Sequence, residues 1–337
     1  MRLLVFISAF LFPLTAFADG DFTFRRPAMG TVWTIKLYAP DGKTAKEAAD
    51  AAFARVEELN GILSDYLPES ELSRLSATAG AGRAVTIKRD LMTVLELSQQ
   101  AAAESGGVFD ITIGPCVQLW RTARRTKKLP AAADLKAAVT ATGWESLVLD
   151  PKAGTALLKK PGMKLDAGGI AKGFAQDEAM KVLKEKFKIT SALIDCGSPL
   201  VSGRPPGRES WNVQIAQTGE EDAEPVILGV ENACVDTSGD LNQFVEIDGV
   251  RYSHIIDKNT GLGLQESTQA TVVAPTAALA DWLSTALCVM GPDKSMEYMR
   301  KHHPELQARV ERRGKDGAVT VKETEGFGRL KVKAKGK

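Results

Sequence analysis

An otherwise apolar segment, residues 277–290, carries Asp281 and Thr285 four positions apart. A Pro-Thr pair with Thr276 as N-cap precedes it and a Gly-Pro pair starting at Gly291 follows it, so the segment is predicted to be a helix. Residues four apart share one face of a helix. Because apolar residues lie on every side, the helix is expected to be buried. A buried carboxylate needs a cationic side chain, backbone donors or a metal ion as its partner.

The oxygens of Asp281 and Thr285 suit a hard cation such as Mg²⁺, which prefers oxygen ligands and usually acts beside a substrate phosphate. A structural interpretation is also open. The Thr285 hydroxyl can bond back to the carbonyl of residue 281, and Asp281 can pair with a lysine from elsewhere. Taken alone, the pair favours the structural interpretation, since buried polar groups are more often satisfied than functional. Other segments must decide between the two.

The first eighteen residues have the pattern of an export signal, with Arg2, an apolar run over residues 3–12 and a small-x-small end at Ala16 and Ala18. We therefore expect a soluble exported protein, periplasmic in a Gram-negative bacterium. No other segment is apolar for long enough to span a membrane. The formal net charge is +1, so the chain offers no strong field to nucleic acid or to an anionic membrane surface.

Helical and strand patterns are mixed without regular βαβ alternation, which favours one α+β unit over residues 19–337. Helices are expected over 43–63, 90–104, 134–142, 170–187, 277–290 and 293–302. Strands are expected over 31–38, 191–195, 211–216, 225–237 and 269–274, with hairpins over 147–159 and 243–256 and a final strand pair. The four cysteines, at 116, 196, 234 and 288, show no CxxC spacing, which argues against a zinc or thioredoxin-like site and leaves a disulfide open.

A glycine-rich turn, residues 165–173, lies between an expected strand and an expected helix and includes Asp166 and Lys172. Free amides at a helix N-terminus attract anions, and glycines let a phosphate approach the main chain. The motif matches neither GxGxxG nor GK[ST], so Rossmann and P-loop sites are not indicated. A turn that only lets the helix pack closely, with Lys172 in solvent, is an equal alternative.

Polar residues gather in two further segments. Asp110 and Thr112 precede a Gly-Pro pair and can hold a ring edge or a ribose, although such residues more often satisfy local amides. His254 lies at the end of the expected second hairpin, close to Asp257 in sequence, where it can act as a general base or be structural. Tyr66, in an early loop, can stack on a planar ring or simply border the core.

Taken in order, these segments resemble the ApbE family, the FAD:protein FMN transferases and related periplasmic flavin-trafficking proteins. The matching stretches lie at 29–31, 64–66 with 70–72, 109–115, 166–173, 194–197, 237–240, 254–257 with 260–261, and 280–281 with 284–287.

The resemblance implies a mixed-sheet α+β fold, related to the T-fold, with an FAD cleft between two lobes. It implies Mg²⁺ at the pyrophosphate of FAD and transfer of FMN to a Thr or Ser hydroxyl of an exported redox protein, with release of AMP. Asp281 and Thr285 would be metal ligands, with a carbonyl of the turn at Gly169, and His254 would be the base. The FAD site would be lined by Met29, Tyr66, Phe109, Asp110, Asp166, Lys172 and Ile255.

Two other functions remain open within the same family. A flavin carrier would hold or deliver FAD without covalent transfer. An FAD pyrophosphatase would use water in place of the acceptor hydroxyl. The presence of Asp281, Thr285 and His254 favours catalysis over binding alone.

Overall fold

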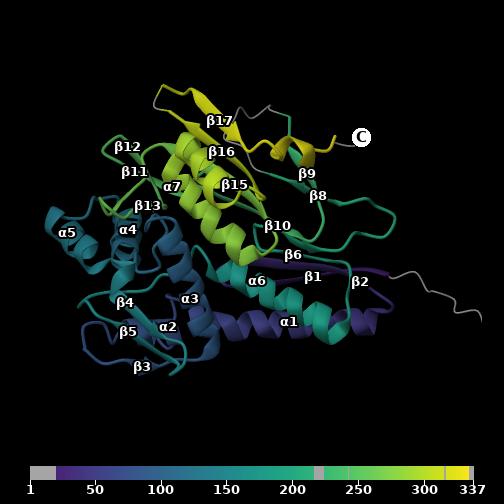
Figure 1. Ribbon diagram of the computed structural model, residues 1–337, viewed down its shortest axis with the longest axis horizontal. Coiled ribbons are helices and arrows are strands. Elements are labelled where there is room, and N and C mark those ends of the chain that lie inside the picture. The colour runs from purple at the N-terminus through teal and green to yellow at the C-terminus, as the bar shows by residue number, and fades with distance from the viewer. Residues whose placement is uncertain (1–19, 216–223, 242, 315, 334–337) are drawn as a thin grey trace, which may run out of the picture.

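An eight-stranded sheet runs through the computed structural model, which describes residues 20–215, 224–241, 243–314 and 316–333 (Figure 1). The predicted export signal, residues 1–18, lies outside the described residues. All neighbouring strands of the sheet pair antiparallel. In sheet order they are β1 (Gly20–Ala28), β2 (Thr31–Ala39), β6 (Ala192–Asp195), β7 (Leu200–Ser202), β10 (Ala233–Gly239), β15 (Ser267–Ala274), β16 (Gln307–Arg313) and β17 (Val319–Glu323).

The first hairpin of the sheet is fixed by its residue pattern. Trp33, Ile35 and Leu37 alternate along β2 and are completely buried, because successive side chains of a strand point to opposite faces. The two turn residues, Met29 and Gly30, both have positive φ, 45° and 78°. Such a two-residue turn matches the twist of the strands it joins.

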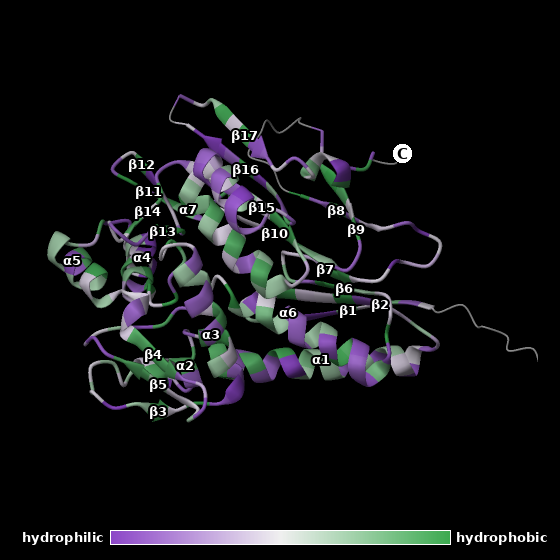
Figure 2. Ribbon diagram, in the orientation of Figure 1, coloured by the Kyte–Doolittle hydropathy of each residue, from purple (hydrophilic) through white to green (hydrophobic). Residues whose placement is uncertain are grey.

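Three helices cover one face of this sheet: α1 (Gly42–Leu63), α6 (Ala171–Lys181) and α7 (Ala277–His302). The chain turns through a short π-helix, Val182–Lys186, directly after α6. In Figure 2, α1 alternates hydrophobic and hydrophilic stretches, in keeping with one buried side. The two helices expected over 277–290 and 293–302 are joined as α7, which kinks at Gly291 with φ 74°.

A smaller lobe lies beside the sheet, at the left of Figure 1. It contains the strands β3 (Val85–Thr86), β4 (Leu147–Asp150) and β5 (Thr155–Leu158), and the helices α2 (Glu71–Ser76), α3 (Arg89–Glu104), α4 (Gly114–Thr126) and α5 (Ala132–Ala141). Short 3-10 turns lie at Trp144–Ser146 and Phe327–Leu330. Two-stranded sheets are formed by β8 (Trp211–Gln214) with β9 (Ile227–Val230), β11 (Phe244–Ile247) with β12 (Val250–Ser253), and β13 (Ile256–Asp257) with β14 (Leu262–Gly263).

The predicted α+β class is confirmed, with several local corrections, among them that no strand in the described part of the chain leads into the glycine-rich turn and that α2, β3 and β7 were not expected. Residues 225–237 are not one strand, because the chain turns at Asn232 (φ 49°) between β9 and β10. Strand β1 and helix α4 were not expected. All four cysteines are buried and free of disulfide bonds. Among the described residues, no helix combines the length and the hydrophobicity needed to cross a bilayer.

Candidate functional site

Asp281 lies at the contact between α6 and α7, and its residue is only 6% exposed. The main-chain N–H of Gly173 donates a hydrogen bond of 3.0 Å to Asp281 Oδ2. No residue with a side-chain carbon fits at position 173, because a Cβ there would lie 2.3 Å from the carbonyl oxygen of Ala277. Burial, followed by the nearby charge of Asp236, raises the pKa of Asp281 to about 7.

Thr285 belongs to a chain of hydroxyl groups that ends at a second buried carboxylate. Ser238 Oγ lies 3.1 Å from Thr285 Oγ1 and 2.8 Å from Ser284 Oγ, and Ser284 donates to Asp236 Oδ2. The hydroxyl within hydrogen-bond distance of the carbonyl of residue 281 is that of Ser284, at 3.0 Å, and not that of Thr285. The hydroxyl of Thr285 thus pairs with Ser238 in place of the bond to residue 281 that the structural interpretation expected.

The glycine-rich turn meets α7 at Thr285. A Cβ placed on Gly169 would lie 3.3 Å from Thr285 Oγ1 and 3.2 Å from Phe109 Cε2, so the main chain of the turn, the hydroxyl and this ring are in close contact. The described residues contain no cluster of three or more His, Cys, Asp or Glu side chains arranged to hold a metal ion. They do bring together a carboxylate, a hydroxyl and the main chain of a turn, all of which supply oxygen. Such a donor set fits Mg²⁺, which is commonly held by one or two carboxylates.

Lys172, in the first turn of α6, supplies positive charge beside this group. Burial acts to lower its pKa, but the electrostatic influence of its acidic neighbours, Asp281 first, outweighs burial and the pKa is raised. No carboxylate of the described residues forms a direct ion pair with Lys172. Its ammonium group thus stays charged and available to an anion.

Asp166 and Tyr66 are joined through Arg121 of α4. The guanidinium donates to Asp166 Oδ2 at 3.0 Å and to Asp65, and its carbon lies 3.9 Å from the centre of the Tyr66 ring. Tyr66 is 72% exposed, so its other face is open to a planar ligand. Burial and the neighbouring Asp65 raise the pKa of Asp166 to about 6. Sequence reasoning missed Arg121, because the helix that carries it was not expected.

Phe109 and Asp110 are both buried. Phe109 packs edge-on against Trp282 of α7, with ring centres 6.0 Å apart. Asp110 Oδ1 accepts from the N–H and hydroxyl of Thr112 at 2.9 and 2.6 Å, and Oδ2 accepts from the Trp144 N–H at 3.1 Å. Asp110 therefore satisfies local amides, as the structural alternative predicted, and these bonds fix the conformation of the segment that carries it. Burial raises the pKa of Asp110.

His254 directly follows β12. The carbonyl oxygen of Gln243 accepts from the His254 main-chain N–H at 3.0 Å and lies 3.1 Å from Nδ1. This contact favours the tautomer with the proton on Nδ1, so that Nε2 carries the lone pair. Burial lowers the pKa of His254 below its ordinary value, which keeps the ring neutral at pH 7.

The remaining two predicted residues lie on different elements. Ile255 is buried, and its N–H donates to Ser253 Oγ at 3.0 Å. Met29 lies in the turn between β1 and β2. Thr34, near the start of β2, pairs with Asp195, the last residue of β6, so this turn lies at the same edge of the sheet as the end of β6. Direct contacts therefore unite Asp281 with the glycine-rich turn, Thr285 with Gly169, and Asp166 with the Tyr66 loop. Met29, His254 and Ile255 come from other elements.

Comparison with known proteins places these residues in a family. Residues 29–310 match the model of the ApbE family. A protein of Haemophilus influenzae named FAD:protein FMN transferase is 31% identical over 82% of this chain and 82% of its own length. One of Treponema pallidum with the same name is 32% identical over 81% of this chain and 80% of its own length.

Solved structures show the same relationship. The flavinyl transferase ApbE of Pseudomonas stutzeri, in its apo form, superposes with a TM-score of 0.82 at 27% identity, covering 94% of this chain and 98% of that one. The flavin transferase ApbE of Vibrio cholerae gives a TM-score of 0.82 at 26% identity, covering 93% and 99%. The chain described here belongs to the ApbE family.

Proposed function

We propose that the protein transfers FMN from FAD to a Thr or Ser hydroxyl of an exported redox protein and releases AMP. Membership of the ApbE family and relatives named FAD:protein FMN transferase support this reaction class. The observation that carries the proposal is the meeting of Asp281, Thr285 and the glycine-rich turn at the start of α6. A diphosphate placed there would face helix amides, a lysine and a group of oxygen ligands.

FAD would be held by residues from both sides of this meeting point. Tyr66 offers an exposed ring to the flavin or adenine, and Lys172 offers charge to the phosphates. Met29, Phe109, Asp110, Asp166 and Ile255 would complete the lining. Asp110 would act mainly by fixing the segment that carries Phe109, since its oxygens are already occupied by hydrogen bonds.

Mg²⁺ would be held by Asp281, Thr285 and the carbonyl of Gly169, where it would offset negative charge on the diphosphate. The protein's own contribution to the leaving group is Lys172 together with the dipole of α6, because the N–H groups of Ala171 and Gly173 already donate to Ala167 and Asp281. Their fixed positive charge and dipoles favour the charge that builds on the departing AMP.

His254 would act on the acceptor. Its Nε2 lone pair would take the hydroxyl proton as the oxygen forms a bond to the flavin-side phosphorus, and the bond from that phosphorus to the AMP oxygen breaks. The carbonyl of Gln243 would hold the ring in the required tautomer throughout. The products are FMN ester-linked to the acceptor and free AMP.

The reaction is proposed to occur outside the cytoplasm, in the periplasm of a Gram-negative source. The export pattern of residues 1–18 supports this location. The proposal needs an acceptor protein that is exported to the same compartment and carries an accessible Thr or Ser.

Purified protein incubated with FAD, Mg²⁺ and a Thr-bearing acceptor domain tests the proposal. Flavin fluorescence that remains on the denatured acceptor, together with free AMP, is the expected result. Free FMN and AMP without labelled acceptor would identify an FAD pyrophosphatase. Bound but unchanged FAD would identify a carrier.

A further inference from the structure

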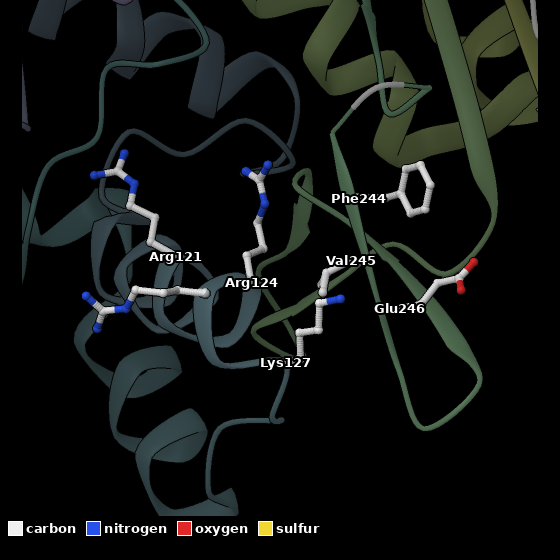
Figure 3. Close-up of a pocket in the computed structure, with 7 residues that line it drawn as sticks. Arg121, Arg124, Lys127, Phe244, Val245 and Glu246 are labelled. Carbon is white, nitrogen blue, oxygen red and sulfur yellow. The ribbon is translucent and has the colours of Figure 1, made fainter.

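A cavity of about 700 Å³ opens between α4 and β11, and its lining is strongly basic. Arg121, Arg124, Arg125 and Lys127 line it on the helix side, and Phe244 and Glu246 are among the residues of the strand side. In Figure 3, Arg124 and Lys127 lie between the end of the helix and the strand, Arg121 points away from the strand, and Phe244 and Glu246 project from its other side. The lining thus contains four cations and one carboxylate.

Three of these cations have no ionic partner among the described residues. Arg121 is engaged with Asp65 and Asp166, but Arg124, Arg125 and Lys127 form no ion pair there, and all three are exposed. Basic residues in the last turn of a helix do stabilise its C-terminus. That effect falls off within one turn and does not require that the cations share the wall of a cavity.

The cavity adjoins the position proposed for the acceptor hydroxyl. Phe244 directly follows Gln243, whose carbonyl holds the His254 ring. After burial, the charge of Arg124 is among the influences that lower the pKa of His254, so the two side chains are electrostatic neighbours. A polypeptide that presents its hydroxyl to His254 must place its adjacent residues close to this basic wall.

We propose that the cavity between α4 and β11 binds an acidic segment of the acceptor protein next to its modified Thr or Ser. This inference rests on the proposed transfer function and adds the chemistry of the partner. The three exposed cations, two in the last turn of α4 and one directly after it, suit more than one carboxylate of a bound segment. The wall formed by Phe244 and Val245 can cover the apolar parts of the same segment.

The test uses a short fluorescein-labelled peptide with one Thr flanked by aspartates, and the same peptide with asparagines instead. Binding is followed by fluorescence anisotropy at about 50 mM and about 200 mM salt. The test variant combines Arg124→Gln, Arg125→Gln and Lys127→Gln. The matched control combines Lys181→Gln, Lys184→Gln and Lys186→Gln, which removes the same charge at the exposed end of α6.

We expect the aspartate peptide to bind the unmodified protein and the control equally, and the test variant about tenfold more weakly at low salt. The difference should shrink at high salt, while FAD binding stays the same in all three proteins. The inference would be overturned if the unmodified protein bound the aspartate and asparagine peptides equally. It would also be overturned if the test variant bound the aspartate peptide as tightly as the unmodified protein does. Displacement of the peptide by AMP, with a matching loss of AMP affinity in the test variant, would reassign the cavity to a nucleotide.

Flavin transfer to the acceptor domain, measured on the same proteins, separates this inference from the proposed function. Normal transfer by the test variant would remove the docking role and leave the transferase intact. Charge-dependent binding of the aspartate peptide without any transfer would leave the surface intact and remove the transferase.

Discussion

The N–H of Gly173 donates to a carboxylate oxygen of Asp281 at 3.0 Å, which joins the first turn of α6 to α7. The two residues are more than a hundred positions apart, and each also belongs to a second feature of the site. Gly173 ends the glycine-rich turn, and Asp281 shares a helix face with Thr285. The bond therefore fixes the turn relative to the oxygens proposed to hold Mg²⁺.

Asp281→Asn should lower Mg²⁺-dependent flavin transfer more than about a hundredfold, because it removes a charged metal ligand. The amide oxygen can still accept from Gly173, so thermal unfolding should stay cooperative. Mn²⁺ binding followed by electron paramagnetic resonance reports on the site directly. Asp177→Asn is the control, since that carboxylate accepts from the N–H groups of Ala277 and Ala278 at the start of α7. Unchanged Mn²⁺ affinity in Asp281→Asn would remove the metal assignment.

Gly173→Ala should destabilise the protein by several kcal/mol or prevent folding, because its Cβ would overlap the main chain of Ala277. Gly61→Ala, in α1, has no atom within 4 Å of the added carbon and should be neutral or slightly stabilising. Urea denaturation compares the two. Equal stabilities would show that α6 and α7 can move apart at no cost.

Arg121→Lys should weaken FAD binding by about tenfold, because an ammonium group cannot contact Asp65 and Asp166 in the forked geometry of a guanidinium. It also loses the flat surface that supports Tyr66. Quenching of flavin fluorescence on binding measures the dissociation constant. Arg125→Lys, one turn further along α4, is the comparison and should bind FAD normally.

His254→Ala should reduce transfer by about a hundredfold or more and leave FAD binding intact. In the unmodified protein, burial lowers the pKa of His254, so the neutral ring is present at pH 7 and is lost only as the pH falls through a value below 6.5. Transfer should therefore be flat near neutrality and decline in acid. A pH profile at saturating FAD tests this, and a decline that persists in His254→Ala would assign it to another group.

The stability of the protein should also depend on pH through Asp177. Burial raises its pKa from 3.8 to about 6, so the folded state keeps a proton that the unfolded state releases between these values. The stabilisation is complete below pH 3.8 and is lost as the pH rises through about 6. Relative to Asp177→Asn, the unfolding free energy should fall by on the order of 3 kcal/mol across this interval. The unfolding free energy of both proteins is measured by urea denaturation at a series of pH values. The same pH dependence in both proteins would contradict the prediction.

Local patterns predicted most helices of this fold. Thr276 does cap α7, accepting from Leu279, and the turn at 248–249 joins β11 to β12 as its Asp-Gly pair indicated. Helix α4 was missed because its Gly114-Pro115 start reads as a rigid turn. Proline is equally suited to the first helical position, where no N–H is needed. Strand β1 was missed because it is an edge strand with little buried surface.

The site was less accessible to sequence reasoning than the fold. The spacing of Asp281 and Thr285 placed both on one helix face, but their partners Gly173 and Ser238 come from distant segments. Arg121 could not be identified, since its role depends on Asp65 and Asp166 being brought to one helix. Which distant residues come into contact is determined by tertiary packing, and local sequence patterns carry no information about it.

The segments that carry His254 and Asp281 pack against different parts of the protein. Asp281 is set between two long helices that pack on the main sheet, whereas His254 follows a two-stranded hairpin that packs on α4. In the proposed reaction, substitutions in the hairpin strands β11 and β12 would alter the surface offered to the acceptor and leave Asp281 and the helices that hold it in place. Under the proposed function, one phosphate-binding scaffold would thus be adapted to different acceptor proteins by changes confined to a few peripheral residues.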